Sequence, residues 1–290
     1  MDGDEAYLLL LLSDSNLPTG SFVASSGLES YVTHGFLTGG PSSEVSKSVP
    51  SGTGPIVDFV RSSLSTYSRS ALPFVADAHQ LVQSRISQCE EGHDVTLQET
   101  LKDFASIDDL YDTMTLNHIT RRASTSQGVA LLTLYSKGFA RPISKSDSTS
   151  EEDKRDLYLS RLIDELKLSV RRGDTPGHLP TCWGVLTGAL GLSLERSQFL
   201  HLFLYARGLL SAAVRMNNLG PYGAQQLLLH TIRPLVEQEA KLCSHLRTGL
   251  NFPSTDSDDL GTLDGPAMTW PLGEVLAGRH DLQHSRVFNS

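Results

Sequence analysis

Apolar side chains recur at every third or fourth residue through most of this sequence, and that spacing constrains the fold more than any other feature. Such a period places apolar residues on one face of an α-helix, and no stretch shows the strict alternation of a half-buried strand. We therefore predict an all-α fold, a single-domain helical bundle of about nine helices. The predicted helices cover residues 21–35, 55–68, 70–90, 96–113, 115–138, 152–171, 178–191, 194–217 and 221–248.

Capping signals mark two of the predicted helix starts. Thr96 and Glu99 have the spacing of a capping box, and Ser193 stands before a helix with Glu195 in its first turn. Gly220 and the proline after it provide a helix end and a change of direction. These signals predict where the helices begin and end.

Polar stretches divide the chain into a helical body and a tail. The body is predicted to cover 1–250, with loop insertions near 38–55 and 144–156. An acidic linker follows at 251–266, and residues 267–290 form a C-terminal tail that we expect to bind a partner.

The charge and the apolar runs exclude two classes of partner. The net charge of −9, with no block of Lys and Arg, predicts no binding to nucleic acid. The apolar run Tyr7–Leu12 follows Asp2, Asp4 and Glu5, so it lacks the basic start of a signal peptide. It is also far shorter than the roughly 20 residues that span a bilayer. Three widely spaced cysteines fit a reducing compartment, so we expect a cytoplasmic protein without membrane contact.

The segment Leu17–Glu29 raises the question of a phosphate-binding loop. A P-loop needs a lysine after its last glycine, but Gly27 is followed by Leu and Glu29, and Gly20 lies too far from it. The alternative is a packing surface, in which Pro18 and Gly20 make a turn and Ser21 caps a helix with a small-residue face. The residues favour the packing surface.

Metal and catalytic patterns are weak. His280 and His284 have the i, i+4 spacing of two ligands on a helix, but no third ligand follows at a known spacing, so we predict no metal site. No nucleophile–base or paired-carboxylate pattern stands out, so the residues alone show no active site. Ser124 follows two arginines, as in a kinase substrate, and it lies within a helical pattern.

Four segments together resemble the urease accessory protein family UreF. The first two are Leu17–Phe22 with Ser26–Glu29, and the set Arg121, Ser124 and Gly128. The third comprises Gly184, Gly191, Ser211–Arg215 and Leu219–Gly220; the fourth is the terminal set Arg279, His280, Gln283, Ser285, Arg286, Phe288 and Ser290. The order of the four and the coverage of nearly the whole chain make the resemblance specific. Thr19 with Ser21, His118 with Ile119, Asp281 and Asn289 depart from the family pattern.

The resemblance implies a dimerising, all-α chaperone that is not itself an enzyme and has no cofactor of its own, here of a fungal or plant-like kind. Members bind the accessory protein UreD (also called UreH), recruit the GTPase UreG and dock on apo-urease; the assembled complex handles nickel transiently. The residues that the resemblance assigns to partner binding are Pro18, Gly20, Phe22, Ser26, Gly27, Glu29, Arg121, Ser124, Gly128, Ser211, Arg215, Gly220, Arg279, His280, Gln283, Ser285, Arg286 and Phe288. In the tail, Arg279, Arg286 and Phe288 would be the anchors.

Two other functions remain open from the sequence. One is a GTPase-activating type of regulator that inserts Arg121, Arg122 or Arg215 into a nucleotide site. The other is a helical enzyme whose active site has no recognisable pattern.

Overall fold

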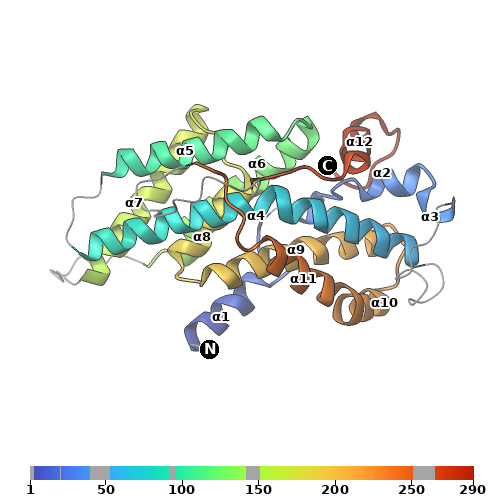
Figure 1. Ribbon diagram of the computed structural model, residues 1–290, viewed down its shortest axis with the longest axis horizontal. Helices are drawn as coiled ribbons and strands as arrows, with labels where there is room; N and C mark the ends of the chain where they lie inside the picture. Colours follow the sequence, from blue (N-terminus) through green and yellow to red (C-terminus); the bar gives the residue numbers. More distant parts are fainter. Residues whose placement is uncertain (1–2, 20, 40–52, 92–95, 142–150, 251–264) are drawn as a thin grey trace.

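The structure is a computed structural model that describes residues 3–19, 21–39, 53–91, 96–141, 151–250 and 265–290. Within these ranges it contains helices and no strand, so the all-α prediction is confirmed. The α-helices are α1 Gly3–Leu12, α2 Leu28–Thr33, α3 Phe36–Gly39, α4 Gly54–Glu90, α5 Leu97–Met114, α6 His118–Leu134, α7 Glu151–Arg172, α8 Leu179–Ala189, α9 Leu194–Arg215, α10 Pro221–Gln226, α11 Arg233–Cys243 and α12 Pro271–Gly278 (Figure 1). The described ranges also contain short 3₁₀ turns, η1 (Ser21–Val23) and η5 (His280–Leu282), and π-helical segments, η3 (Tyr135–Phe139) and η4 (Leu227–Ile232).

Helix α4 runs unbroken for 37 residues, and the prediction of two helices, 55–68 and 70–90, is wrong. The predicted break falls between Ser68 and Ser70. Both hydroxyls instead donate to carbonyls of the preceding turn, at 3.0 Å and 3.3 Å, so the helix itself satisfies them. Pro73 lies inside the helix without ending it.

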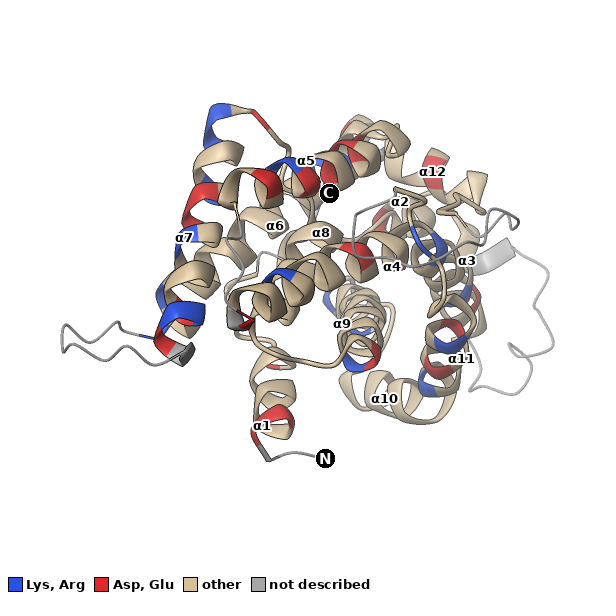
Figure 2. Ribbon diagram, turned by 60° about the vertical axis from the view of Figure 1, so that its left-hand side comes forward, with Lys and Arg blue, Asp and Glu red and all other residues tan. Residues whose placement is uncertain are grey.

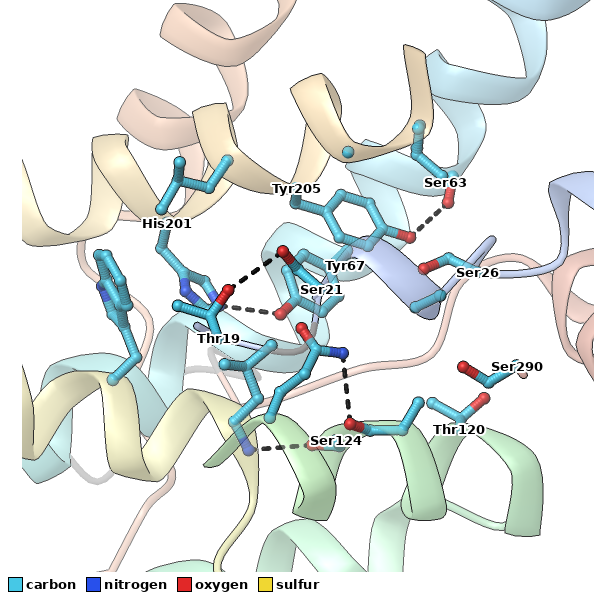
Figure 3. A pocket seen from close by; sticks show the side chains of 18 of the residues that line it. Thr19, Ser21, Ser26, Ser63, Tyr67, Thr120, Ser124, His201, Tyr205 and Ser290 are labelled. Carbon is cyan, nitrogen blue, oxygen red and sulfur yellow. Dashed lines mark hydrogen bonds between the residues drawn. The ribbon is translucent and has the colours of Figure 1, made fainter. Parts of the chain in front are cut away.

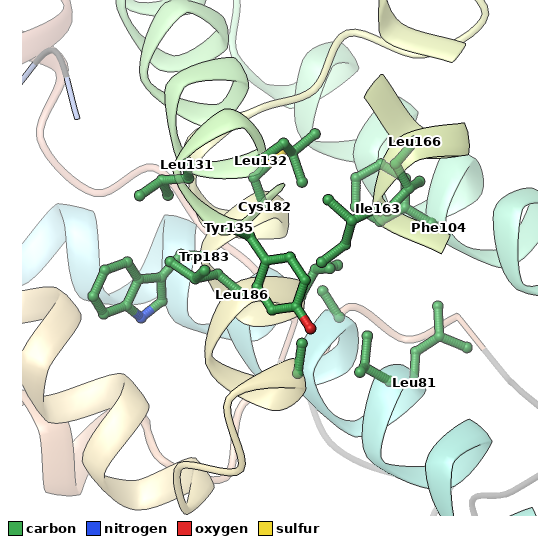
Figure 4. Close-up of a cluster of buried hydrophobic side chains, with 14 of the residues drawn as sticks. Leu81, Phe104, Leu131, Leu132, Tyr135, Ile163, Leu166, Cys182, Trp183 and Leu186 are labelled. Carbon is green, nitrogen blue, oxygen red and sulfur yellow. The ribbon is translucent and has the colours of Figure 1, made fainter. Parts of the chain in front are cut away.

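Two hydrophobic clusters form the core, and α4 contributes to both. Leu81, Phe104, Leu131 and Leu186 belong to the cluster in Figure 4, between α4, α5, α6 and α8. The second cluster lies between the N-terminal half of α4 and the helices α9 and α11. Helix α8 carries no charged residue and is almost wholly buried beside α4 (Figure 2). A Cβ at Gly184 would lie 2.5 Å from the carbonyl oxygen of Val75, so α4 and α8 meet backbone to backbone.

A buried carboxylate ties α5 to the start of α8. Asp108 accepts hydrogen bonds from the backbone N–H groups of Gly177 (2.5 Å) and His178 (2.9 Å). The hydroxyls of Thr175 and Thr181 also donate to it, at 2.7 Å and 2.5 Å. These contacts place a negative charge at a helix N-terminus, where the helix dipole stabilises it. No local sequence signal indicated this role for Asp108.

Several predicted boundaries differ from the structure. Residues 21–35 do not form one helix, because Ser26 (φ 50°) and Gly27 (φ 86°) adopt left-handed backbone conformations; α2 starts after Gly27, so Ser21 does not cap it. The range 115–138 begins as α6 and ends in η3, and 221–248 consists of α10, η4 and α11, with Cys243 as the last helical residue. Helix α1 was not predicted, and α7 already begins inside the predicted loop 144–156.

The two predicted N-cap positions are confirmed, but the predicted hydrogen bonds from their side chains to the helix are absent. Thr96 and Ser193 are the N-cap residues of α5 and α9, yet neither side chain bonds to its own helix. Ser193 instead donates to Glu5 of α1, at 2.9 Å. The rest of the predicted loops (40–52 and 144–150) and most of the acidic linker (251–264) lie outside the described residues.

Candidate functional site

The C-terminal tail, residues 265–290, packs on the chain's own helices. Helix α12 lies against α2 and α6, and the chain then returns along the entry segment 21–30 (Figure 1). The prediction pictured this tail as ordering on a partner. The structure shows that it has a docking place on the body, and residues of the first and third family-like segments contact it there.

Glu29 is the buried centre of this docking place. Its side chain accepts hydrogen bonds from the backbone N–H groups of Val287 (2.5 Å) and Phe288 (3.2 Å). The Nε2 atom of His280, fully buried, lies 3.2 Å from the same carboxylate. A carboxylate offers several acceptor positions, so one residue of α2 holds two backbone groups and a side chain of the tail.

The last residues of the chain pair with the entry segment through their backbones. The N–H of Asn289 donates to the carbonyl of Val23 at 2.9 Å, and the N–H of Ser25 donates to the carbonyl of Ser290 at 2.6 Å. Nearby, the Gln283 amide donates to the hydroxyl of Ser30 at 2.6 Å. The terminal residues therefore occupy a defined register on the body.

Gly27 gives α12 room to approach. Its φ of 86° disfavours other residues, and a Cβ built there would lie 3.4 Å from the backbone nitrogen of Ala277. The glycine predicted to serve packing geometry does so, and the neighbour that it admits is the tail.

Arg215 connects the end of α9 to both the entry segment and the tail. Its guanidinium carbon lies 3.7 Å from the ring centre of Phe22 and 4.1 Å from that of Phe288. Such stacking is an attractive cation–π contact on each side. Phe288 is only 3% exposed in this conformation, and its role as an anchor for a partner stays a prediction.

Arg122 holds the tail from the side of α6. Its guanidinium donates two hydrogen bonds to Asp281, both 3.0 Å, and a third to the carbonyl of Asn289 at 2.9 Å. Arg286 donates to the same carboxylate at 2.8 Å. The hydrogen bonds from Arg122 hold the pKa of Asp281 well below its usual range. Arg122 entered the sequence analysis only as a possible inserted arginine, and Asp281 only as a departure from the family pattern.

The middle motif has structural roles inside the body. Arg121 donates to the carbonyls of Thr115 and Asp112 at the end of α5. Ser124 is 7% exposed and accepts the backbone N–H of Leu179 at 3.0 Å, so the kinase-substrate interpretation is wrong. Gly128 faces the carbonyl oxygen of Gly177, which a Cβ would approach to 2.2 Å.

The remaining predicted residues are dispersed. Arg279 donates to His34 at 3.0 Å, and Ser285 is exposed on the tail. Pro18 is exposed, Gly220 is the N-cap of α10, and Ser211 lines the cavity described below. Gly20 lies outside the described residues, while Ser26 lines the same cavity as Ser211.

A cavity of about 250 Å³ lies under the tail, next to these contacts (Figure 3). Two partly buried hydrogen bonds line it, one between Tyr67 and His201 (2.9 Å) and one between Ser63 and Tyr205 (2.6 Å). Burial lowers the pKa of His201 to about 3 and raises that of Tyr205 to about 12. Neither group is therefore charged near neutral pH.

The described part of the chain offers no metal site of three or more His, Cys, Asp or Glu side chains. His280 and His284 do not share a helix face, because η5 ends at Leu282 and Gln283 is extended. Among the described residues, no helix is both long and apolar enough to cross a membrane.

The structure thus defines an all-α protein in which residues of the first and third motif segments hold the C-terminal tail on the body. The sequence model of the UreF family matches residues 55–232, more than half of the chain. Urease accessory protein 6 of Cryptococcus neoformans is 42% identical over 99% of this chain and 97% of its own length. A UreF-like urease accessory protein of Schizosaccharomyces pombe is 28% identical over 99% of this chain, and urease accessory protein F of Arabidopsis thaliana is 25% identical over 96%. The chain belongs to the UreF family.

Proposed function

We propose that this chain acts in urease maturation as a non-enzymatic accessory protein, and that its docked tail presents the surface for the UreD (UreH) accessory protein. The observation that carries the proposal is that residues of the first and third motif segments, together with Arg122, hold the fourth segment, the tail, on the body. Many contacts hold the 26 residues 265–290 on the surface of the body. These contacts fix the positions of the side chains that the tail exposes.

The outer side of the tail has the composition of a protein-binding surface. It leaves apolar side chains in solvent, and exposed apolar groups that gather in one place mark interaction sites. These exposed residues, on the tail and next to it, are Leu116, Leu272, Val275, Leu282 and Val287. Arg279 and Arg286 add exposed cations to the same segment.

In this proposal the complex with UreD then recruits the GTPase UreG and docks on apo-urease in the cytoplasm. Nickel is the cargo of the assembled complex, and this chain contributes placement of the proteins rather than ligands for the metal. The relatives named above are called accessory proteins, which fits a role without turnover.

The GTPase-activating alternative is less well supported, because an inserted arginine must be free to leave its own chain. Arg121 is bonded to the end of α5, Arg122 to the tail, and Arg215 lies between two rings. Each would have to break these contacts before reaching another active site.

The test uses substitutions on the outer surface that leave the docking contacts intact. The double variant Val275→Glu with Leu282→Glu should lose capture of the co-expressed UreD protein and fail to restore urease activity in a strain lacking the gene. Leu229→Glu, on the exposed side of η4, is the matched control and should behave as wild type. Capture of UreD by the double variant at the wild-type level would refute the proposed surface.

We also propose a homodimer that forms through the outer side of α1. Leu12 is buried and Leu8 and Leu9 pack on the core, yet Tyr7 and Leu10 on the opposite side are exposed. A helix that is apolar all round is normally covered on all sides. Light scattering of the purified protein should give twice the chain mass, and Leu10→Glu should halve it. A wild-type mass of one chain, or a dimer that survives the substitution, would refute this interface.

A further inference from the structure

The cavity under the tail is large enough for a small organic molecule. Its volume is about 250 Å³, and an engineered protein cavity of about 150 Å³ is known to hold benzene. The tail forms part of its wall, through Trp270, Glu274, Ala277 and Ser290. The cavity is therefore complete only when the tail is docked.

Aromatic faces dominate the part of the lining contributed by α4, α8 and α9. Tyr67 stacks on Tyr205 with their ring centres 3.9 Å apart, and Trp183 lies on the same cavity next to His201. Flat apolar walls with a few polar groups are typical of sites for ring-containing ligands.

The histidine, tyrosine and serine side chains of the lining are uncharged. Burial keeps His201 neutral and Tyr205 protonated at neutral pH, and the hydroxyls of Ser63 and Ser26 are neutral (Figure 3). These groups can donate to or accept from a hydroxyl or N–H, but they cannot neutralise an ion.

The charged residues on the lining are either engaged or disfavoured as ions. Arg207 donates to the carbonyl of Ser13, and Arg215 lies between its two rings. Burial raises the pKa of Glu274, which favours its neutral form. Asp14 lies at an exposed position and accepts from Asn16. The cavity therefore favours a neutral ligand over a charged one.

The tail is the wall most able to move. It buries Leu276 and Phe288 and packs Trp270 against Phe59, but it leaves Val275, Leu282 and Val287 exposed, so only a few apolar side chains hold it down. Most of its other contacts are hydrogen bonds and ion pairs, and water can replace these when the tail lifts. Segments with few buried apolar contacts open at the lowest free energy in a fold.

We propose that this cavity binds a small uncharged aromatic molecule of one or two rings bearing a hydroxyl or N–H group, and that the tail admits it by lifting. This ligand site is additional to the partner surface, which lies on the other side of the tail.

The binding test uses the full chain and 5-fluoroindole, followed by fluorine NMR. Ala123 lines the cavity from α6, and Ala123→Leu should weaken binding at least tenfold by filling the space. Val129→Leu, exposed on the same helix, is the matched control and should bind as wild type. Tyr205→Phe keeps the ring and removes only the hydroxyl, and it should weaken binding severalfold. Circular dichroism checks that each variant is folded.

Three results would overturn the ligand site. They are no saturable binding to the wild-type chain, equal effects of the Ala123 and Val129 substitutions, and equal affinity for an indole that carries a carboxylate.

The movement of the tail is tested with a disulfide. A Cβ at Gly27 would lie 3.8 Å from that of Ala277, within the roughly 3.5–4.5 Å that a disulfide requires. The double variant Gly27→Cys with Ala277→Cys should bind the probe at least tenfold more slowly when oxidised than when reduced. Gly27→Cys alone controls for the strain at this position and should show no redox effect. An equal rate in the two redox states would show that the ligand enters without lifting the tail.

Discussion

Glu29 should hold the tail on the body, and its removal should release the tail without unfolding the helices. Glu29→Gln keeps the size of the side chain. It removes the negative charge that Val287 N–H, Phe288 N–H and His280 share. The amide also replaces one acceptor oxygen with a donor, so at least one of these groups loses its partner.

The magnitude follows from these contacts. Hydrogen bonds to charged groups contribute about 1.5–3 kcal/mol each, and a buried group left without a partner costs about 1–3 kcal/mol. We expect the substitution to weaken tail docking by about 2–4 kcal/mol. Burying one Phe side chain contributes about 1.5–3 kcal/mol, so the loss is comparable to the contribution of Phe288.

Hydrogen exchange of the tail amides measures this change directly. At 1.4 kcal/mol per tenfold, exchange at Val287, Phe288 and Asn289 should accelerate roughly 30- to 700-fold. Amides of α4 should keep their wild-type protection. Glu195→Gln, an exposed carboxylate in the first turn of α9, is the control and should leave the tail unchanged. Acceleration below threefold in Glu29→Gln would refute the assignment of Glu29 as the centre of docking.

Three further predictions concern the body. Gly128→Ala would place a Cβ 2.2 Å from the carbonyl oxygen of Gly177, and it should lower the free energy of unfolding, measured by urea denaturation, by about 1–3 kcal/mol. The control is Gly138→Ala, whose Cβ would have only Leu134 nearby, at 3.5 Å. Equal losses in the two variants would contradict the close contact at Gly128. Asp108→Asn should cost about 2–4 kcal/mol in the same assay, because one amide oxygen cannot satisfy four donors; a loss below 1 kcal/mol would argue against this capping role. The pKa of His201 is about 3 in the folded chain and 6.5 in the unfolded chain, so the unfolded chain binds a proton more readily. The contribution of His201 to stability is therefore complete above pH 6.5. Below pH 6.5 it falls by about 1.36 kcal/mol per pH unit, down to about pH 3. His201→Gln should make the denaturation midpoint less dependent on pH between 6.5 and 5, and an unchanged dependence would contradict the burial argument.

The sequence determined the helical class and the family, because both depend on short-range patterns. The three-to-four spacing of apolar residues reflects contacts within one helix, and three of the four motif segments are each under 20 residues long. The same local view failed where another element satisfied a polar group. The predicted break between Ser68 and Ser70 lies inside α4, and Ser193 looked like a cap but bonds to Glu5.

Only the tertiary structure decided what the motifs do. Glu29 and Val287, which are 258 positions apart in the sequence, form a hydrogen bond, and so do Arg122 and Asp281, which are 159 positions apart. No local sequence pattern can predict either contact. Phe288 looked like an exposed anchor because aromatic residues at a chain end have no local partner in the sequence. In the structure, Arg215 and the core of the second cluster provide that partner. Secondary structure follows from neighbours along the chain, whereas the docking of the tail follows from side chains that only the folded helices bring together.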